Sequence, residues 1–470
     1  MPLLRVKKKQ SRFFEWFLDN PGRMIVASFA LIILLGTLLL ILPISSNRGQ
    51  WTNPAEALFT ATSATCVTGL VVHDTASYFS SFGQVVILLL IQIGGLGLAT
   101  LMGFVLSFRS QSSQWKTMAI TQASTAAGSM TEAMTLVRHI MAITLSFEGI
   151  ATLYFSYRFY PIWGAKAIWR ALFHSVSSFC NAGFDLNGSS DSPFVSLTAY
   201  NQSPDILLLT AFLFIAGGLG FVVWLEIFRW PKRRKFSFHA KLILSLTLIF
   251  LLVSTLLVAG LEWHNHSNSI ALGSLPVHER PTAAFFQAAS LRTAGFNSID
   301  QASLSEPTKL MSSFFMFVGA APAGTGGGVK LSTFAVIFAM LVSNSSRRKE
   351  VRVRRYLFED KIVRSALTVI SLSLILIFVS LFLLMIFETS ALKSGRFGSI
   401  DLLYEVSSAF GTVGLSSLGT PNLSLPSRLV LIICMFLGRV GPASFAVALV
   451  RPPKKEESDR VLAPAETLVG

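Results

Sequence analysis

The chain has 470 residues, of which 52% are hydrophobic and only 13% are charged, and its mean hydropathy is +0.60. This composition excludes an ordinary water-soluble globular domain and indicates an integral membrane protein. The formal net charge of +15 could indicate a nucleic-acid partner, but 27 of the 39 Lys and Arg residues lie in five segments, at the chain ends and between alternate pairs of apolar runs.

Eight segments are long and apolar enough to form membrane-spanning helices, because about 20 helical residues cross a hydrocarbon core of about 30 Å. Five are uncharged, at 24–42, 82–108, 206–225, 242–261 and 365–387. Three carry one interior charge each: 139–157 with Glu148, 310–343 with Lys330, and 429–450 with Arg439. The first span is long and lacks a small-residue cleavage site, so we expect it to remain in the protein.

The five basic segments predict the topology. They are residues 5–23, 109–138, 229–241 and 347–364, and the tail after Val450. By the positive-inside rule these segments face the cytoplasm, so both termini are cytoplasmic and the protein lies in the inner (plasma) membrane. This placement explains the net charge without nucleic acid. Segments 229–235 and 347–355 are more basic than orientation requires, and we expect them to contact anionic lipid or a cytosolic partner.

Four short segments between paired spans align without gaps and indicate a fourfold repeat. Each has an aromatic residue third, small residues seventh and eighth, and glycine thirteenth. The segments are ALFTATSATCVTGL (57–70), ALFHSVSSFCNAGF (171–184), AAFFQAASLRTAGF (283–296) and LLYEVSSAFGTVGL (402–415). Their glycines, which we call the turn glycines, are Gly69, Gly183, Gly295 and Gly414, spaced 114, 112 and 119 residues apart.

Each repeat consists of a span, a short segment and a second span. The short segment holds an apolar helix of about ten residues, half the length that crossing requires, so it enters and leaves the membrane from the same, outer side. We therefore predict an all-α membrane protein of eight transmembrane helices, in four helix/pore-loop/helix repeats with pseudo-fourfold symmetry around one ion pore. The predicted units are a basic N-terminus (1–21), pore repeats at 22–110, 111–230, 231–345 and 346–450, and a C-terminal tail (451–470).

Four re-entrant turns around one axis can form an ion path. Non-helical backbone survives at membrane depth only where it is buried in protein or lines water. The turns would present carbonyl oxygens that replace the hydration shell of a cation, with the partly negative C-termini of the short helices aimed at the axis. The alternative is that the glycines only permit close helix packing, which is common in membrane proteins. Four turns in the same register favour the ion path.

The segment APAGTGGGVK (321–330) interrupts the second span of the third repeat with a proline and four glycines. Because an unwound backbone at membrane depth needs water or protein partners, we expect this segment to lie in a wet cavity on the cytoplasmic side of the turns and to act as a gate. The predicted gate residues are Ala323, Gly324, Thr325, Gly326, Gly327, Gly328, Lys330 and Arg439.

Arg439 occupies the corresponding place on the last span, where a central charge costs about 2.5 to 3.5 kcal/mol on insertion scales. We expect its guanidinium to bond the carbonyls of the 323–328 loop. The alternative is a structural ion pair with Glu148 or Glu226. Lys330 closes the loop, and its ammonium either extends into the same cavity or bonds loop carbonyls.

The motifs TATSATCVTGL, NAGF, LRTAGFNS, SAFGTVGL and IQIGGLG resemble those of the Trk/Ktr/HKT superfamily of potassium transporters, over residues 22–450. The sequence has no extra helix pair before the first repeat, and in this respect it is most similar to the KtrB branch. The resemblance implies gated potassium uptake with K⁺ in the pore, no covalent cofactor, and a dependence on Na⁺ that the sequence leaves open. It also implies a homodimer and a cytosolic nucleotide-binding ring of the KtrA or TrkA type as partner.

Carried onto this sequence, the resemblance implies a selectivity filter formed by Thr68, Gly69, Ala182, Gly183, Ala294, Gly295, Val413 and Gly414. Glycine at 69 favours potassium, because serine at that position goes with sodium transport in the superfamily. The adjoining residues are predicted to support the filter: Thr65, Cys66, Val67, Cys180, Asn181, Arg292, Thr293, Gly411 and Thr412. We expect Arg292 to point behind the filter and pair with a carboxylate such as Asp185 or Asp300.

Two other functions compete with an ion pore. A sodium-coupled secondary transporter would also place a broken helix at its substrate site, but four units of one orientation suit a pore better than two rocking halves. A membrane-embedded enzyme is disfavoured because no nucleophile, base and orienting residue come together. The three cysteines show no paired metal-ligand spacing, so no disulfide framework or metal site beyond the transported K⁺ is expected.

Overall fold

The protein is almost entirely helical in the part that the computed structural model describes, residues 21–97, 130–346, 350–353 and 356–442. The first two predicted repeats contain α2 (Pro21–Ile41), α3 (Pro54–Thr65), α4 (Thr75–Tyr78), α5 (Ser81–Leu96), α8 (Met130–Trp163), α9 (Ala167–Phe179), α10 (Pro204–Gly218) and α11 (Phe221–Arg233). The last two contain α12 (Phe238–Glu262), α13 (Arg280–Ser290), α14 (Glu306–Phe317), α15 (Leu331–Ser345), α16 (Asp360–Phe387), α17 (Thr389–Lys393), α18 (Ser399–Gly411) and α19 (Leu425–Val440). A two-stranded antiparallel ribbon, β1 (Arg352–Val353) and β2 (Tyr356–Leu357), precedes α16.

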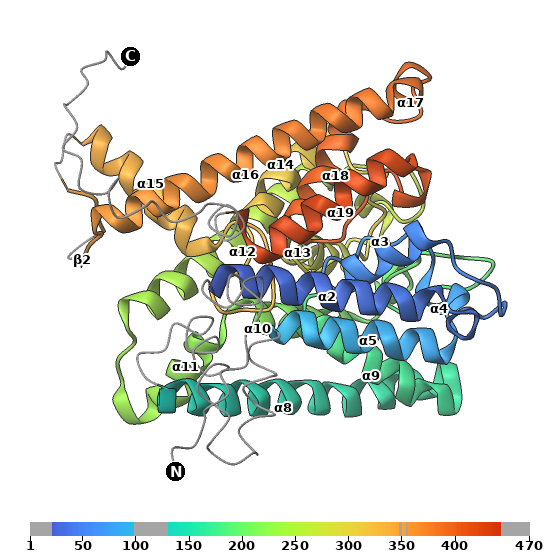
Figure 1. Cartoon of the computed structure of the whole chain (residues 1–470), viewed down its shortest axis with the longest axis horizontal. Helices are drawn as coiled ribbons and strands as arrows, with labels where there is room; N and C mark the ends of the chain where they lie inside the picture. The colour runs from blue at the N-terminus through green and yellow to red at the C-terminus, as the bar shows by residue number, and fades with distance from the viewer. Residues whose placement is uncertain (1–20, 98–129, 347–349, 354–355, 443–470) are drawn as a thin grey trace, which may run out of the picture.

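Several of these helices are long and apolar enough to cross a membrane. Within the described residues, α2, α12, α16 and the continuous helical stretch from α8 into α9 meet this criterion, and the pair α10 and α11 adds a fifth span if the two count as one. The long helices α2, α5, α8 and α16 run in roughly the same direction across the molecule (Figure 1). Leu38 on α2, Leu256 on α12 and Phe378 on α16 are 62, 72 and 71% exposed, which suits contact with lipid tails. The chain is thus a multi-pass helical membrane protein.

The predicted span 206–225 is not one straight helix, and this corrects the sequence analysis. α10 ends at Gly218, α11 begins at Phe221, and their axes differ by 101°. Gly220, with φ 86° and ψ 136°, takes the chain out of the helix, and the N–H of Phe221 donates to the carbonyl of Ala323 at 3.0 Å. Glycine adopts a positive φ at little cost. The apolar run therefore continues through a turn that hydropathy alone does not reveal.

The same backbone conformation ends α5 and α19. Gly97 has φ 79° and ψ 135°, and Gly441 has φ 91° and ψ 127°. The second helix thus stops at a glycine in three repeats. In the remaining repeat the chain is non-helical between α14 and α15, from Val318 to Lys330, where the sequence predicted a break. The later parts of the predicted spans 82–108 and 429–450 lie outside the described residues.

The four short helices, α3, α9, α13 and α18, take part in a closed cycle of helix contacts. Each packs against the long helix that precedes it, which is α2, α8, α12 or α16. Each is also contacted by the second helix of the preceding repeat: α5 contacts α9, α10 contacts α13, α14 contacts α18, and α19 contacts α3. The last of these contacts joins the fourth unit to the first.

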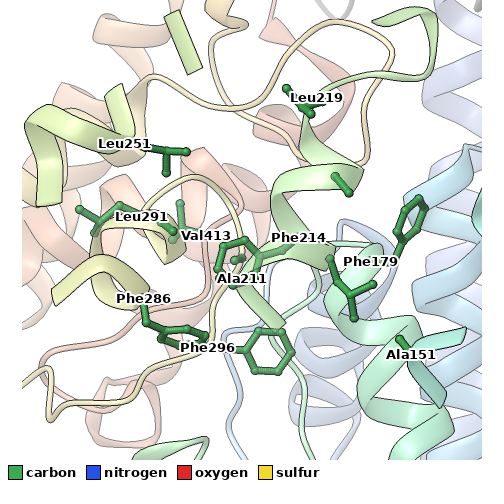
Figure 2. Packing of buried hydrophobic residues seen from close by; sticks show 14 of the residues in the cluster. Ala151, Phe179, Ala211, Phe214, Leu219, Leu251, Phe286, Leu291, Phe296 and Val413 are labelled. Atoms are coloured by element: carbon green, nitrogen blue, oxygen red, sulfur yellow. The ribbon is translucent and has the colours of Figure 1, made fainter. Parts of the chain in front are cut away.

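Two large apolar clusters form the core around these short helices. One runs from α8 to α14 and includes Phe214 and Phe286, whose ring centroids are 5.8 Å apart (Figure 2). The other joins α2, α3 and α5 to α18 and α19. The turns after the short helices reach into both clusters, with Val413 in the first and Val67 in the second. Close packing on two sides therefore holds the turns in place.

Candidate functional site

Each short helix is followed by a turn in which two residues adopt positive φ. The first of the pair is Val67 (55°), Asn181 (60°), Thr293 (65°) or Thr412 (51°), and the second is the turn glycine, Gly69 (94°), Gly183 (69°), Gly295 (81°) or Gly414 (95°). A β-branched residue with positive φ is a genuine conformational outlier. Three of the four turns contain one, which indicates strain of about 1 to 3 kcal/mol per residue, held by the surrounding structure.

The N–H groups of the turns are bonded back to the short helices. Thr68, Ala182 and Val413 donate to the carbonyls of Ser63, Ser177 and Ser408, each at 2.8 Å, and Ala294 donates to Ser290 at 3.1 Å. The side chains of the same serines hold the exit of each turn: those of Ser63 and Ser408 accept from Gly69 and Gly414, whereas those of Ser177 and Ser290 donate to Phe184 and Phe296. Serine hydroxyls on the short helices thus fix all four turns.

The carbonyl groups of the turns have no such partners. We call the oxygens of Thr68, Gly69, Ala182, Gly183, Ala294, Gly295, Val413 and Gly414 the turn carbonyls. Within the described residues none of the turn carbonyls accepts a hydrogen bond. The four residues that precede the turn glycines are fully buried. Since more than nine in ten buried backbone carbonyls are normally paired, four fully buried unpaired ones in one ring require an explanation.

The turn glycines are neighbours in cyclic order. A β-carbon built on Gly69 would lie 3.1 Å from the Cα of Gly183, one on Gly183 would lie 2.8 Å from the Cα of Gly295, and one on Gly295 would lie 3.5 Å from the Cα of Gly414. One on Gly414 would lie 2.9 Å from the Cα of Gly69, which closes the ring. Side chains would fill this ring, so only glycine leaves the backbone of all four turns in contact.

A cavity of about 420 Å³ opens on one side of this ring. All four turn glycines line it, together with the carboxylates Asp74, Asp185 and Asp300. Burial raises the pKa of Asp185 to about 7, and the nearby charge of Asp74 adds to this, although a hydrogen bond from the N–H of Asn187 and the charge of Arg170 oppose it. A cavity lined by carboxylates concentrates cations next to the turns. We call this cavity the outer vestibule.

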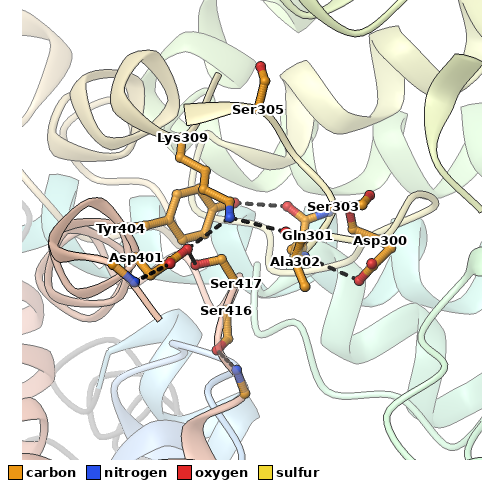
Figure 3. Close-up of polar contacts among 12 residues, drawn as sticks. Asp300, Gln301, Ala302, Ser303, Ser305, Lys309, Asp401, Tyr404, Ser416 and Ser417 are labelled. Atoms are coloured by element: carbon orange, nitrogen blue, oxygen red, sulfur yellow. Dashed lines mark hydrogen bonds and ion pairs between the residues drawn. The ribbon is translucent and has the colours of Figure 1, made fainter. Parts of the chain in front are cut away.

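Polar contacts between the third and fourth repeats build one wall of the outer vestibule (Figure 3). The ammonium of Lys309 lies 2.8 Å from the carboxylate of Asp401, and both side chains are largely buried. Ser417 also donates to Asp401, at 2.9 Å. Nearby, the hydroxyl of Tyr404 donates to the amide oxygen of Gln301 at 2.8 Å. The Tyr404 bond joins the short helix of the fourth repeat to the loop that leaves the third turn, and the Lys309 ion pair joins the same helix to α14.

The 318–330 loop lies against the opposite end of the turns. The hydroxyl of Thr325 donates to the side-chain oxygen of Asn181 at 2.7 Å, and the N–H of Gly327 donates to the hydroxyl of Thr412 at 3.0 Å. A β-carbon on Gly326 would collide with the side chain of Thr293. The loop thus touches the second, third and fourth turns, which leaves no room for side chains at 326 and 327.

Arg439 holds the same loop from α19. Its guanidinium donates to the carbonyl of Thr325 and to the carbonyls of Gly94 and Gly95 at the end of α5. The alternative that the sequence left open, an ion pair with Glu148 or Glu226, does not occur among the described residues, because Glu148 accepts from Gln92 and Glu226 from Ser237. Hydrogen bonds to three backbone carbonyls therefore stabilise the buried charge of Arg439. Lys330 donates to the carbonyl of Gly326 at 2.7 Å.

The expected partner of Arg292 is absent. Within the part of the chain that the structure describes, Arg292 forms no ion pair with Asp185 or Asp300, which accept from Asn187 and from Asn268 and Ala302. Both carboxylates line the outer vestibule, whereas Arg292 is buried and does not line it. The pairing prediction was wrong because the sequence did not tell that both carboxylates lie on the vestibule side of the turns.

The other predicted support residues lie where their turns pack against the second helices. Cys66 and Cys180 are buried and unpaired by disulfide, and the thiol of Cys180 lies 3.8 Å from the amide oxygen of Gln92. Gly411 packs against the carbonyl of Met316. Within the described chain, none of these three residues lines the outer vestibule.

One set of contacts was missed by the sequence analysis. A β-carbon on Gly94, Gly217 or Gly438 would collide with the carbonyl oxygen of Thr65, Phe179 or Phe410, which is the ninth residue of its repeat segment in each case. The signal was present in the sequence as the recurring GGLG of 94–97 and 217–220, and GRVG at 438–441. These glycines let the second helices of the first, second and fourth repeats touch the C-terminal end of their own short helix.

Comparison with known proteins identifies one family and several relatives that match nearly the whole chain. The model of the TrkH family, described as a cation transport protein, matches residues 7–459. The chain is 36% identical over 445 residues to Ktr system potassium uptake protein B of Bacillus subtilis (strain 168), covering 94% of this chain and 96% of that protein. It is 34% identical over 442 residues to potassium/sodium uptake protein NtpJ of Enterococcus hirae, covering 94% and 95%. The crystal structure of the potassium transporter TrkH from Vibrio parahaemolyticus has a similar fold, with a TM-score of 0.68 at 17% identity over 95% of this chain and 86% of that one.

The ion pair in the vestibule wall predicts a stability effect. Replacing Lys309→Met leaves the carboxylate of Asp401 largely buried without its cation, which should destabilise the fold by about 3 kcal/mol. The thermal midpoint of the purified protein in detergent should fall, and the double variant with Asp401→Asn should recover part of the loss. The exposed Lys393→Met is the matched control. An unchanged midpoint for Lys309→Met would show that the pair contributes nothing.

Proposed function

The chain belongs to the TrkH family of cation transport proteins, and from this premise we propose that it is the ion-conducting membrane subunit of a gated potassium uptake system. Membership confirms the resemblance to the Trk/Ktr/HKT superfamily and makes the protein a transporter and not an enzyme. The proposal concerns what the family assignment leaves unspecified: the ion, the filter, the gate and the partners.

The observation that carries the proposal is the set of eight unpaired turn carbonyls in a ring of glycines. Leaving buried carbonyls unpaired is costly unless something else binds them. A desolvated monovalent cation is such a partner, because carbonyl oxygens can replace its hydration shell. The turn carbonyls are therefore the proposed selectivity filter, with the outer vestibule as its entrance.

Potassium is the ion that we favour. Among the relatives, two from Bacillus subtilis and Vibrio alginolyticus are named Ktr system potassium uptake protein B, at 36 and 37% identity. Residue 69 is glycine and not the serine that accompanies sodium transport in the superfamily. The relative from Enterococcus hirae is named for both potassium and sodium, so sodium coupling is the specific alternative.

The proposed gate is the 318–330 loop with Arg439. The loop lies on the side of the turns opposite the outer vestibule, in the path that an ion would take from the filter to the cytoplasm. The guanidinium of Arg439 bonds the carbonyl of Thr325 and so adds a positive charge below the filter. A fixed positive charge in a low-dielectric passage raises the barrier for a cation. Displacement of the loop would open the path.

The proposed architecture is the predicted one of eight spans in four pore repeats, at 22–110, 111–230, 231–345 and 346–450, around a pseudo-fourfold axis. The closed cycle of contacts from α5·α9 through α19·α3 supports it. We also propose cytoplasmic termini, an inner-membrane location, a homodimer and a cytosolic nucleotide-binding ring as partner. The Ktr system names of the relatives support a partner subunit.

Flux into liposomes that contain the purified protein tests this function. Rubidium or potassium uptake should proceed down its own gradient with or without sodium. Uptake that requires a sodium gradient and saturates like a carrier would favour the sodium-coupled alternative, and no uptake of either ion by folded protein would contradict both.

Widening the ring should weaken selectivity. A β-carbon at Gly69 would lie 2.7 Å from the carbonyl oxygen of Ala182 and would force a positive φ on serine, so Gly69→Ser must shift the filter. We expect the preference for potassium over sodium to fall at least about tenfold, equivalent to about 1.4 kcal/mol. Gly260→Ser, which meets no atom within 4 Å on α12, is the control. Unaltered selectivity in Gly69→Ser would remove the filter assignment.

Removing the gate charge should speed uptake. Arg439→Ala, or deletion of residues 324–328, should raise potassium uptake in the absence of a regulatory partner, because the bonds from Arg439 to the loop are lost. The exposed Arg364→Ala removes the same charge from α16 and serves as the control. Equal or lower uptake by well-folded gate variants would count against the gate.

External pH should modulate uptake through Asp185. With its pKa raised to about 7, this carboxyl is mainly charged at pH 8 and mainly neutral at pH 6, so the vestibule attracts fewer cations as pH falls. At subsaturating potassium, uptake should drop roughly twofold between pH 8 and pH 6. Asp185→Asn should give low uptake without this dependence, and Asp191→Asn in the exposed part of the same loop should retain it. A pH profile unaffected by Asp185→Asn would refute this role.

A further inference from the structure

Asn181 connects three parts of the ion path. It has positive φ in the second turn, one residue before the filter carbonyl of Ala182. Its side-chain oxygen accepts from the hydroxyl of Thr325 in the 318–330 loop at 2.7 Å. Its side-chain nitrogen lies 3.3 Å from the hydroxyl of Thr293 in the third turn. All three side chains are fully buried, so water does not replace these bonds.

Every polar group of Thr325 forms a hydrogen bond. Its N–H donates to the carbonyl of Gly217 at 3.1 Å, and its carbonyl accepts from Arg439. Its hydroxyl lies within reach of both Asn181 and the carbonyl of Phe179, at the C-terminus of the second short helix. Thr325 therefore links Asn181 directly to Arg439 and to the loop, so a displacement of either would break or strain the bond to Asn181.

A second connection runs in parallel. The hydroxyl of Thr412, which has positive φ in the fourth turn, accepts from the N–H of Gly327 at 3.0 Å. The equivalent residue in the first turn, Val67, has no polar side-chain group. The loop thus makes hydrogen bonds to the residues that set the backbone of two opposite turns of the ring.

We propose that the 318–330 loop is a positioning element of the filter as well as a gate, with Thr325–Asn181 and Gly327–Thr412 as the connections, so that release of the loop lowers discrimination between potassium and sodium. This rests on the proposed function and adds to it. A non-glycine residue with positive φ relies on surrounding contacts to keep that conformation. When the loop moves and Thr325 separates from Asn181, the buried side-chain oxygen of Asn181 loses its hydrogen-bond donor. The peptide that carries the Ala182 carbonyl then gains freedom to rotate.

Isosteric substitution of the connecting threonines tests this. Thr325→Val keeps the shape and removes the hydroxyl, whereas Thr325→Ser keeps the hydroxyl. In liposomes with the full-length protein, the ratio of potassium to sodium uptake should fall about fivefold in Thr325→Val, the factor that one lost hydrogen bond contributes to an equilibrium, and Thr325→Ser should keep the wild-type ratio. Thr412→Val should lower the ratio independently. Thr368→Val, on the exposed face of α16, is the control.

The ratio, and not the total flux, decides the outcome. If Thr325→Val and Thr412→Val conduct faster but discriminate as well as wild type, the loop is a separate plug and the inference is wrong. If Thr325→Val does not fold, Thr412→Val alone decides by the same criterion. A wild-type protein that shows no preference for potassium would overturn the proposed function, and this inference with it.

Discussion

Unpaired peptide carbonyls in a dry interior are the constraint on which the rest of this molecule depends. In a bilayer, helices satisfy their own backbone, so an unwound segment is stable only where other groups or water bind it. Here serines on the short helices bind the N–H groups of each turn and leave the carbonyls free. Among the described residues the fold supplies no hydrogen-bond donor for the turn carbonyls, and this is why we propose a cation as their partner.

Glycine at two kinds of position makes this arrangement sterically feasible. The turn glycines bring four backbones into one ring, and Gly94, Gly217 and Gly438 bring the second helices against the ends of the short helices. Contacts from each second helix to the next short helix then close the cycle. Large apolar clusters hold this frame from outside, and they include Val67 of the first turn and Val413 of the fourth.

The sequence predicted those features that recur along the chain or that are rare inside apolar segments. The register of the turn glycines, the break at 321–330 and the charge of Arg439 were all visible, because each is improbable in an apolar chain. It did not predict the bend at Gly220, since hydropathy does not report backbone conformation. It was wrong about Asp185 and Asp300 as partners of Arg292, because sequence does not tell that these carboxylates lie on the vestibule side of the turns. The bonds from Arg439 to α5 join residues more than 300 positions apart and follow only from the closed cycle of contacts.

The proposed filter, the outer vestibule and the proposed gate loop all contact the same ring of turn glycines or the turns that carry it. That ring can be tested by locating the ion. Crystals or vitrified particles prepared in rubidium, with anomalous scattering or density compared against a sodium preparation, should show a bound ion surrounded by the carbonyls of Thr68, Ala182, Ala294 and Val413. A well-resolved ring without rubidium density, or rubidium bound only at a site away from those oxygens, would contradict the account.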